Sequence, residues 1–150
     1  MTTNLVDLIR GYLTPDIVKK ASTFVGESES ATQKAVSGIV PALLAAMANQ
    51  ASTTDGAERL SRMLDTGKYD GSALNNLGSL FSGGEATQKA ITEGKNVLSS
   101  LLGGKTQGLT DQIASFAGVR AGSAASLLAL IVPLIMNLLG RQRSTIGQGP

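Results

Sequence analysis

The feature that most constrains this chain is a stretch of twenty residues without a charged side chain, from Ala121 to Gly140. A helix of about that length spans a lipid bilayer. The strongly apolar part, however, runs only from Leu127 to Leu139, about 13 residues, which is typical of a buried core helix. We therefore expect a core helix near 122–140. A surface between subunits and a membrane-inserted helix are the alternatives.

The same pattern occurs earlier in the chain, 92 positions before. The matched pairs are Phe24 with Phe116, Gly26 with Gly118, Ile39 with Ile131, Val40 with Val132, Pro41 with Pro133 and Gln50 with Gln142. Each copy reads as a short helix that ends in Phe-x-Gly, a turn, and a long apolar helix with a proline near its middle. The sequence therefore predicts an internal duplication, with units at about 15–50 and 107–142.

A proline inside a helix removes one backbone hydrogen bond and costs ~3 kcal/mol or more. We expect Pro41 and Pro133 to kink two central, mostly buried helices that pack near each other, so that the other helices wrap around them. A hinge or a binding notch is the alternative. No polar residue lies within three positions of Pro133, which favours the structural interpretation.

Residues typical of helix ends and turns divide the repeated unit. Thr14 suits the N-cap of the first short helix, and Gly26 suits the left-handed position after its end. Ser30, followed three residues later by Gln33, has the form of a capping box and predicts the start of the first long helix. Gly118 occupies the position of Gly26 in the second unit.

Further helices are predicted by apolar residues at helical spacing, and no segment reads as a strand. They are expected at about 5–13, 55–64, around Leu77 and Leu80, between the glycine pairs 83–84 and 103–104, and at 109–117. The fold class is therefore an all-α multihelical bundle with an internal duplication of a short helix–turn–long proline-kinked helix unit. We expect one domain over 1–140 and a flexible C-terminal tail over 141–150.

The composition excludes most familiar enzyme chemistry. The chain has no Cys, His or Trp, so it has no disulfide, no thiolate or imidazole metal site and no histidine base. Glu27 and Glu29 lie beside a helix N-terminus, where acidic residues favour the helix dipole rather than acid–base catalysis. We expect no enzymatic activity, no catalytic residue, no cofactor and no metal.

Nucleic-acid binding is not expected either. The net charge is only +2, and aromatic residues make up 3% of the chain. The unit resembles a helix-turn-helix, but its second helix offers only Gln33, Lys34 and the pair Asn49-Gln50 to base edges. A five-residue echo, Ala-Thr-Gln-Lys-Ala at 31–35 and 86–90, has no assigned role.

Three apolar stretches carry a resemblance to a known family. They are Leu5 to Ile9, Ala35 to Leu44, and Leu127 to Ile135. On these motifs the chain resembles the bacterial domain-of-unknown-function family numbered 937, which includes YidB-like proteins. The resemblance implies a small all-helical bacterial protein without an assigned catalytic activity or family active-site residues. Some relatives look to be joined to OmpA-like, peptidoglycan-binding domains, which we do not expect in this chain.

The low fraction of charged residues indicates what class of function to expect. Charged residues make up 16% of the chain, below the ~25% usual for soluble domains, so apolar surface remains to be covered. We expect an interaction module that associates with copies of itself, as a homo-oligomer or a filament-like assembly. A membrane-associated protein that uses segment 121–140 is the alternative, and an envelope protein is a further candidate partner. Residues 1–30 lack the pattern of a cleavable signal peptide, so a cytoplasmic location is the default expectation, and export by another route remains open.

Overall fold

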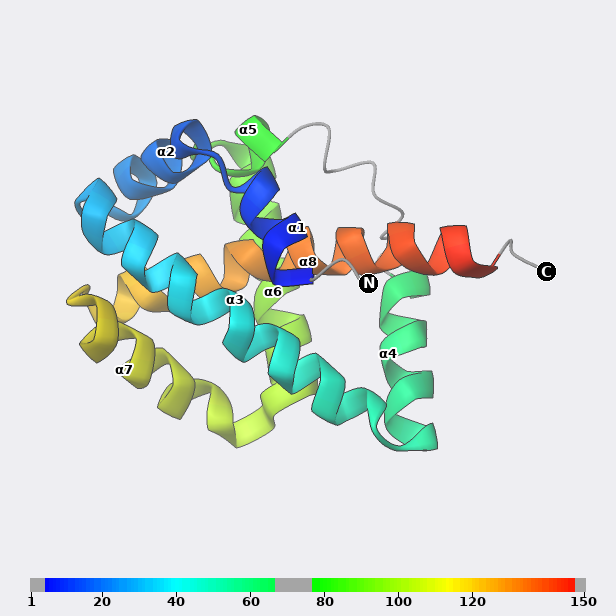
Figure 1. Ribbon diagram of the computed structural model, residues 1–150. Coiled ribbons are helices and arrows are strands. Elements are labelled where there is room, and N and C mark those ends of the chain that lie inside the picture. Colours follow the sequence, from blue (N-terminus) through cyan, green and yellow to red (C-terminus); the bar gives the residue numbers. More distant parts are fainter. Residues whose placement is uncertain (1–4, 67–76, 148–150) are drawn as a thin grey trace.

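The computed structural model describes residues 5–66 and 77–147, and every regular element in these ranges is a helix (Figure 1). The protein is therefore all-α and multihelical. The elements are α1 (Leu5–Tyr12), α2 (Pro15–Val25), α3 (Glu29–Ala51), α4 (Thr54–Thr66), α5 (Leu77–Leu80), α6 (Glu85–Leu102), the 3-10 turn η2 (Gly103–Lys105), α7 (Thr106–Ala117) and α8 (Ala121–Gly147).

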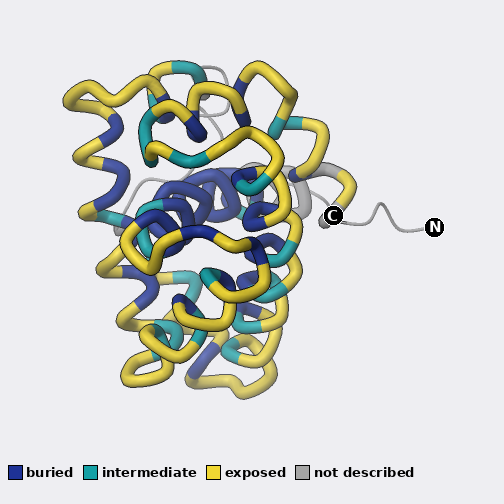
Figure 2. The backbone as a smooth tube through the Cα atoms, turned by 90° about the vertical axis from the view of Figure 1, so that its left-hand side faces the viewer, coloured by how far each residue is buried: buried dark blue, intermediate teal, exposed yellow. Residues whose placement is uncertain are grey.

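Helix α8 lies at the centre of the bundle. Helices α1, α2, α3, α4, α6 and α7 all contact it, and the contact with α6 is the most extensive. Seen along the bundle, buried backbone occupies the middle and exposed backbone surrounds it (Figure 2). A helix that is apolar on all sides is stable in water only when other helices cover it.

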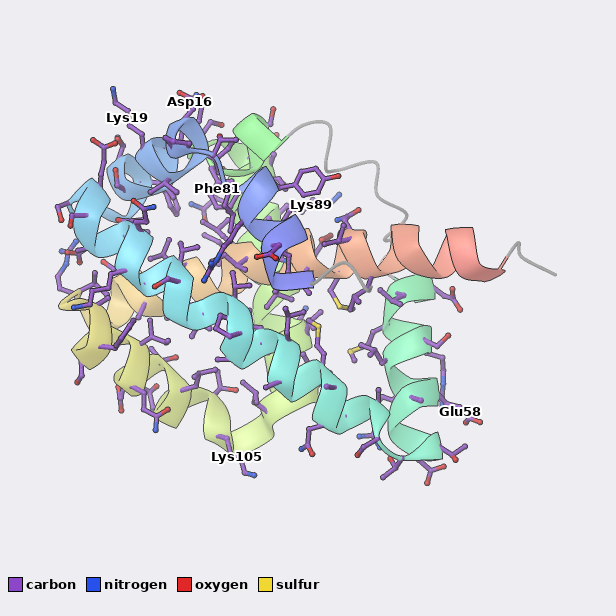
Figure 3. All side chains as sticks on the ribbon, viewed as in Figure 1. Asp16, Lys19, Glu58, Phe81, Lys89 and Lys105 are labelled. Carbon is purple, nitrogen blue, oxygen red and sulfur yellow. The ribbon has the colours of Figure 1, made fainter. Side chains whose placement is uncertain are left out.

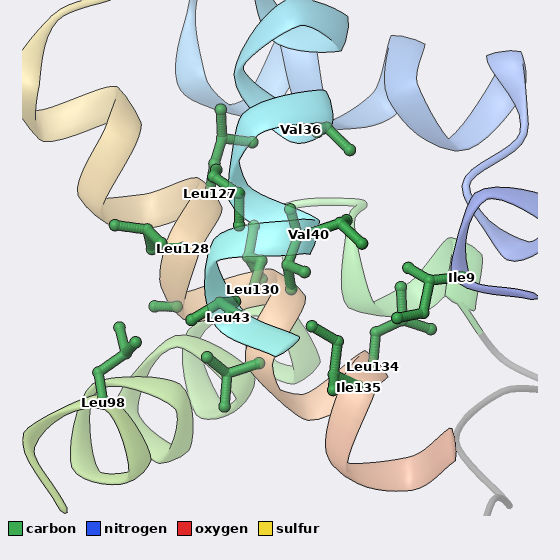
Figure 4. Close-up of a cluster of buried hydrophobic side chains, with 14 of the residues drawn as sticks. Ile9, Val36, Val40, Leu43, Leu98, Leu127, Leu128, Leu130, Leu134 and Ile135 are labelled. Atoms are coloured by element: carbon green, nitrogen blue, oxygen red, sulfur yellow. The ribbon is translucent and has the colours of Figure 1, made fainter. Parts of the chain in front are cut away.

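The core is built mainly from the apolar segment of α8. The six consecutive residues from Leu127 to Val132 are each 0% exposed, and six consecutive residues cover every side of a helix. Figure 4 shows further residues of α8 packed against those of neighbouring helices, with Leu43 contributed by α3 and Ile9 by α1. Burial of each Leu or Ile side chain contributes about 1.5–3 kcal/mol. The segment predicted as a core helix thus lies in the core of the bundle.

Pro133 is matched by a glycine on the neighbouring helix. Because proline has no N–H, the helix supplies no i+4 donor to the carbonyl of Ala129. A Cβ added at Gly94 of α6 would overlap this carbonyl oxygen. Gly94 therefore allows the backbones of α6 and α8 to approach closely at the point where Pro133 interrupts the hydrogen-bond ladder.

Helix α3 departs from the expectation of two buried central helices. In Ala121–Gly140, 78% of the most apolar window is buried, whereas for α3 the share is 39%. Ile39 and Leu43 are fully buried, but Pro41 is exposed and Pro133 is not. Both helices are long and apolar. They differ in burial because other helices enclose α8 and leave one side of α3 open.

The first long helix begins two residues earlier than predicted. Ser28 is the N-cap, and its Oγ accepts a hydrogen bond from the backbone N–H of Ala31 at 3.0 Å. Ser30, predicted as the cap, lies instead in the first turn. The cause is local: both serines suit a cap, and the earlier start places Glu29 in the first turn, where its charge favours the helix dipole.

The C-terminal tail is also shorter than expected. The sequence predicts a flexible tail from residue 141, but α8 continues to Gly147. Residues 148–150 lie outside the described part of the chain. Extension of an existing helix adds one hydrogen bond per residue, and Arg and Gln are good helix formers.

The two short helices, α2 and α7, end in turns of the same geometry. Gly26 has φ 75° and ψ 32°, and Gly118 has φ 74° and ψ 31°. In both turns the glycine N–H donates to the carbonyl four residues earlier at 2.9 Å, and the next N–H donates to the same carbonyl at 3.1 Å. The left-handed φ explains why both positions are glycine. At the start of α2, Thr14 Oγ1 accepts from the N–H of Ile17 at 3.3 Å.

Candidate interaction surface

Helix α3 presents one buried face and one exposed face. The exposed side carries Lys34, Pro41, Ala45 and Ala48, which we call the α3 outer face. Their spacing of three, four and seven residues places them on one side of a helix. Apart from Lys34 these residues are small and uncharged, and the next charged residue along the chain is Asp55.

Phe116 of α7 extends this surface. Its side chain is 52% exposed, and it is the large hydrophobic residue that the described part of the chain leaves open to solvent. A Cβ added at Gly38 would lie 3.1 Å from the ring, so the ring rests on the α3 backbone. The Nζ of Lys34 lies 5.4 Å from the ring centroid, within the range of a cation–π contact.

Lys34 lies at this surface, whereas the charged residues that Figure 3 labels belong to other elements. Asp16 and Lys19 of α2, Glu58 of α4 and Lys105 of η2 lie at the outer edges of the bundle in Figure 3. An exposed apolar area bordered by polar residues is typical of a protein–protein contact site. An aromatic anchor beside small residues is the arrangement in which binding energy is usually concentrated.

The most connected polar cluster joins the two turns. Glu27, which follows α2, accepts through Oε2 from the backbone N–H of Arg120 at 3.1 Å, from Arg120 Nε at 3.0 Å and from the hydroxyl of Ser123 at 2.7 Å. In return, Arg120 Nη2 donates to the carbonyl of Val25 at 2.8 Å. Glu27 thus caps the N-terminus of α8, and Arg120 caps the C-terminus of α2.

These contacts fix the ionisation of Glu27. The hydrogen bond from Ser123, followed by those from Arg120, lowers the pKa of Glu27 from 4.5 to about 2. Its side chain is 13% exposed. A carboxylate held this way stays ionised at neutral pH, and its Oε2 serves as the acceptor that caps α8.

The sequence located part of this arrangement. It placed Glu27 beside a helix N-terminus, but the helix that Glu27 caps is α8, 93 residues away from it in the chain. No local pattern specifies so distant a partner. Of the predicted turn residues, Gly26 contacts the cluster directly, since its carbonyl accepts from Arg120 Nη2 at 3.3 Å. The sequence identified Phe116 only as a position of the internal repeat. Nothing in the neighbouring sequence indicates that its side chain is exposed.

Over 5–66 and 77–147, no group of three Asp or Glu residues is placed where it could hold an ion. By length and composition alone, α3 and the Ala121–Gly140 part of α8 could each cross a membrane.

The comparisons with known proteins give one match. The family model for a bacterial protein of unknown function, DUF937, matches residues 7–142, which is nearly the whole chain. No curated protein and no solved structure matches. The chain therefore belongs to the DUF937 family of bacterial proteins.

Proposed function

We propose that the chain is a non-catalytic helical module that associates with further copies of itself through the α3 outer face and Phe116. The observation that carries this proposal is the 52% exposure of Phe116 beside a helix face that carries no charge beyond Lys34. In the proposal the module acts in the cytoplasm and uses no cofactor. The proposal assigns no catalytic or metal-binding role to any residue.

The relation between the two long helices supports the proposal. We propose that α2–α3 and α7–α8 are copies of one unit, related by the 92-residue shift. The matching turns support this, as do two helix starts with equal bonds, Thr32 N–H to Ser28 O and Ala124 N–H to Arg120 O, both 2.9 Å.

The two copies differ in what covers them. At that shift Pro41, Ala45 and Ala48 correspond to Pro133, Asn137 and Gly140, all of which are buried. On α8 this side is covered within the chain, by α6 at Ala129. In the proposal a second copy covers the corresponding side of α3.

The size of the surface limits the strength of association. A helix face of four turns is about 20 Å long and about 10 Å wide, or roughly 200 Å² per copy, which is well below the ~800 Å² per partner of a standard interface. Apolar burial contributes about 25 cal/mol per Å², and a twofold arrangement uses each contact twice. We therefore expect association that increases with protein concentration rather than a permanent oligomer.

The test is the molar mass in solution, measured by light scattering over a concentration series. The wild-type mass should rise toward that of a dimer or a larger assembly. Ala45→Arg places a charge in the middle of the α3 outer face and should shift the rise to at least about tenfold higher concentration, because a desolvated unpaired charge is costly. The matched control Ala86→Arg changes an exposed alanine of α6 and should behave as wild type.

A strict monomer at high concentration contradicts the proposal, and so does an Ala45→Arg variant that associates like the wild type. Membrane association is the alternative function, because two helices have the length and hydropathy to cross a bilayer. Flotation of the wild type with vesicles would support this alternative. Capture of an envelope protein that Ala45→Arg abolishes would assign the surface to a different partner.

A further inference from the structure

A cavity of about 260 Å³ lies between α1, α2 and α3. Its apolar walls are Leu13, Val18, Val36 and Val40. The three valines are buried and Leu13 is half-buried. The volume holds roughly eight groups of the size of a water molecule, which suits a short chain and excludes a two-chain lipid.

Three polar residues complete the lining, namely Arg10, Gln33 and Ser37. All three are exposed, so the polar side of the cavity faces solvent. Arg10 lies in the last turn of α1 and forms no ion pair with any residue that the structure describes. Because Pro41 has no N–H, the helix also supplies no i+4 donor to the carbonyl of Ser37.

The matching carbonyl on α8 shows why this position stands out. There, the Ala129 carbonyl freed by Pro133 is covered by Gly94. On α3 the equivalent carbonyl belongs to a residue that lines the cavity. The lining therefore combines apolar walls with a guanidinium that has no ion-pair partner among the described residues.

We propose that this cavity binds a monocarboxylate with a short aliphatic chain. The carboxylate pairs with the guanidinium of Arg10, whose planar fork matches two carboxylate oxygens. The chain lies against Leu13, Val36 and Val40. The cavity borders the α3 outer face, because Ser37 lies three residues from Lys34 and four from Pro41. The contacts proposed for the ligand do not depend on self-association.

The experiment is an NMR titration of the full chain with octanoate, with acetate and 1-octanol as comparison ligands. Octanoate should shift the amide signals of the cavity residues at millimolar concentration. Acetate lacks the chain and octanol lacks the charge, so both should bind at least about tenfold more weakly. Equal binding of octanol, or shifts located elsewhere, contradicts the proposal.

Two variants test the contacts. Arg10→Gln removes the charge at an exposed position and should weaken octanoate binding about tenfold. Arg59→Gln, an exposed arginine of α4, is the matched control and should bind as wild type. Val36→Phe fills the cavity and should abolish binding; if it fails to fold, the Arg10→Gln result decides alone. Unchanged affinity in Arg10→Gln overturns the proposal.

Discussion

Glu27 and Arg120 each bind the end of a helix from the other half of the chain. The carboxylate accepts from the first turn of α8, and the guanidinium donates to carbonyls at the end of α2. The helix ends themselves were predictable, because Gly26, Gly118 and Thr14 follow the capping preferences of helix termini, which involve only residues about four positions apart. The long-range pairing was not, because nothing near Glu27 specifies Arg120. The choice between Ser28 and Ser30 was also open, since both serines suit a cap.

The lowered pKa of Glu27 predicts a pH dependence of stability. A carboxyl with pKa about 2 in the folded state and 4.5 as its ordinary value stabilises the fold above pH 4.5. That contribution is lost as the pH falls from 4.5 toward 2. The free energy of unfolding of the wild type, measured by denaturation, should fall more steeply over this window than that of Glu27→Gln. Glu29→Gln changes the exposed neighbouring carboxylate and should follow the wild-type curve.

The observed N-cap gives a second prediction. Ser28→Ala removes the acceptor for the Ala31 N–H and should lower the free energy of unfolding by about 1 kcal/mol. Ser30→Ala, inside the first turn, should change it by less than about 0.5 kcal/mol. The reverse order in urea denaturation would restore Ser30 as the cap.

Helices α3 and α8 differ because of what packs against them. The sequence predicts both as long apolar helices with a central proline, and both are found. It could not tell that α8 is enclosed and α3 is half-exposed, since hydropathy does not record which neighbour covers a face. The close approach of α6 at Gly94 decides this for α8.

Gly94 provides the test at this scale. Gly94→Ala introduces a Cβ that overlaps the Ala129 carbonyl, so α6 and α8 must separate, and the fold should lose about 1–3 kcal/mol of stability. Gly108→Ala is the control: a Cβ in α7 at that position has no atom within 4 Å. It should raise stability by about 0.5–1 kcal/mol, because alanine favours the helix. Thermal unfolding of both variants measures whether each substitution lowers or raises the stability. A stabilised Gly94→Ala variant would contradict the close packing of α6 and α8.

At the scale of the whole molecule, most of the apolar side chains are buried in α8 and in the helix faces that enclose it. Helical spacing predicts the all-α fold, and the low charge predicts that apolar surface is left over. Exposed apolar residues of this kind are found on the α3 outer face and at Phe116. Which helix would carry it was not predictable, because Pro41 and Pro133 have nearly the same sequence context. Self-association through this face is the central claim of our proposed function.

The distance between copies tests this claim most directly. The chain has no cysteine, so Ala48→Cys gives a single site for a spin label on the α3 outer face, and Ala86→Cys gives a control site on α6. Electron paramagnetic resonance spectroscopy of the labelled, associated protein should give short distances between labels at position 48, as expected for helix axes about 8–10 Å apart. Labels at position 86 should give longer ones. Short distances at position 86 and none at position 48 would contradict the account.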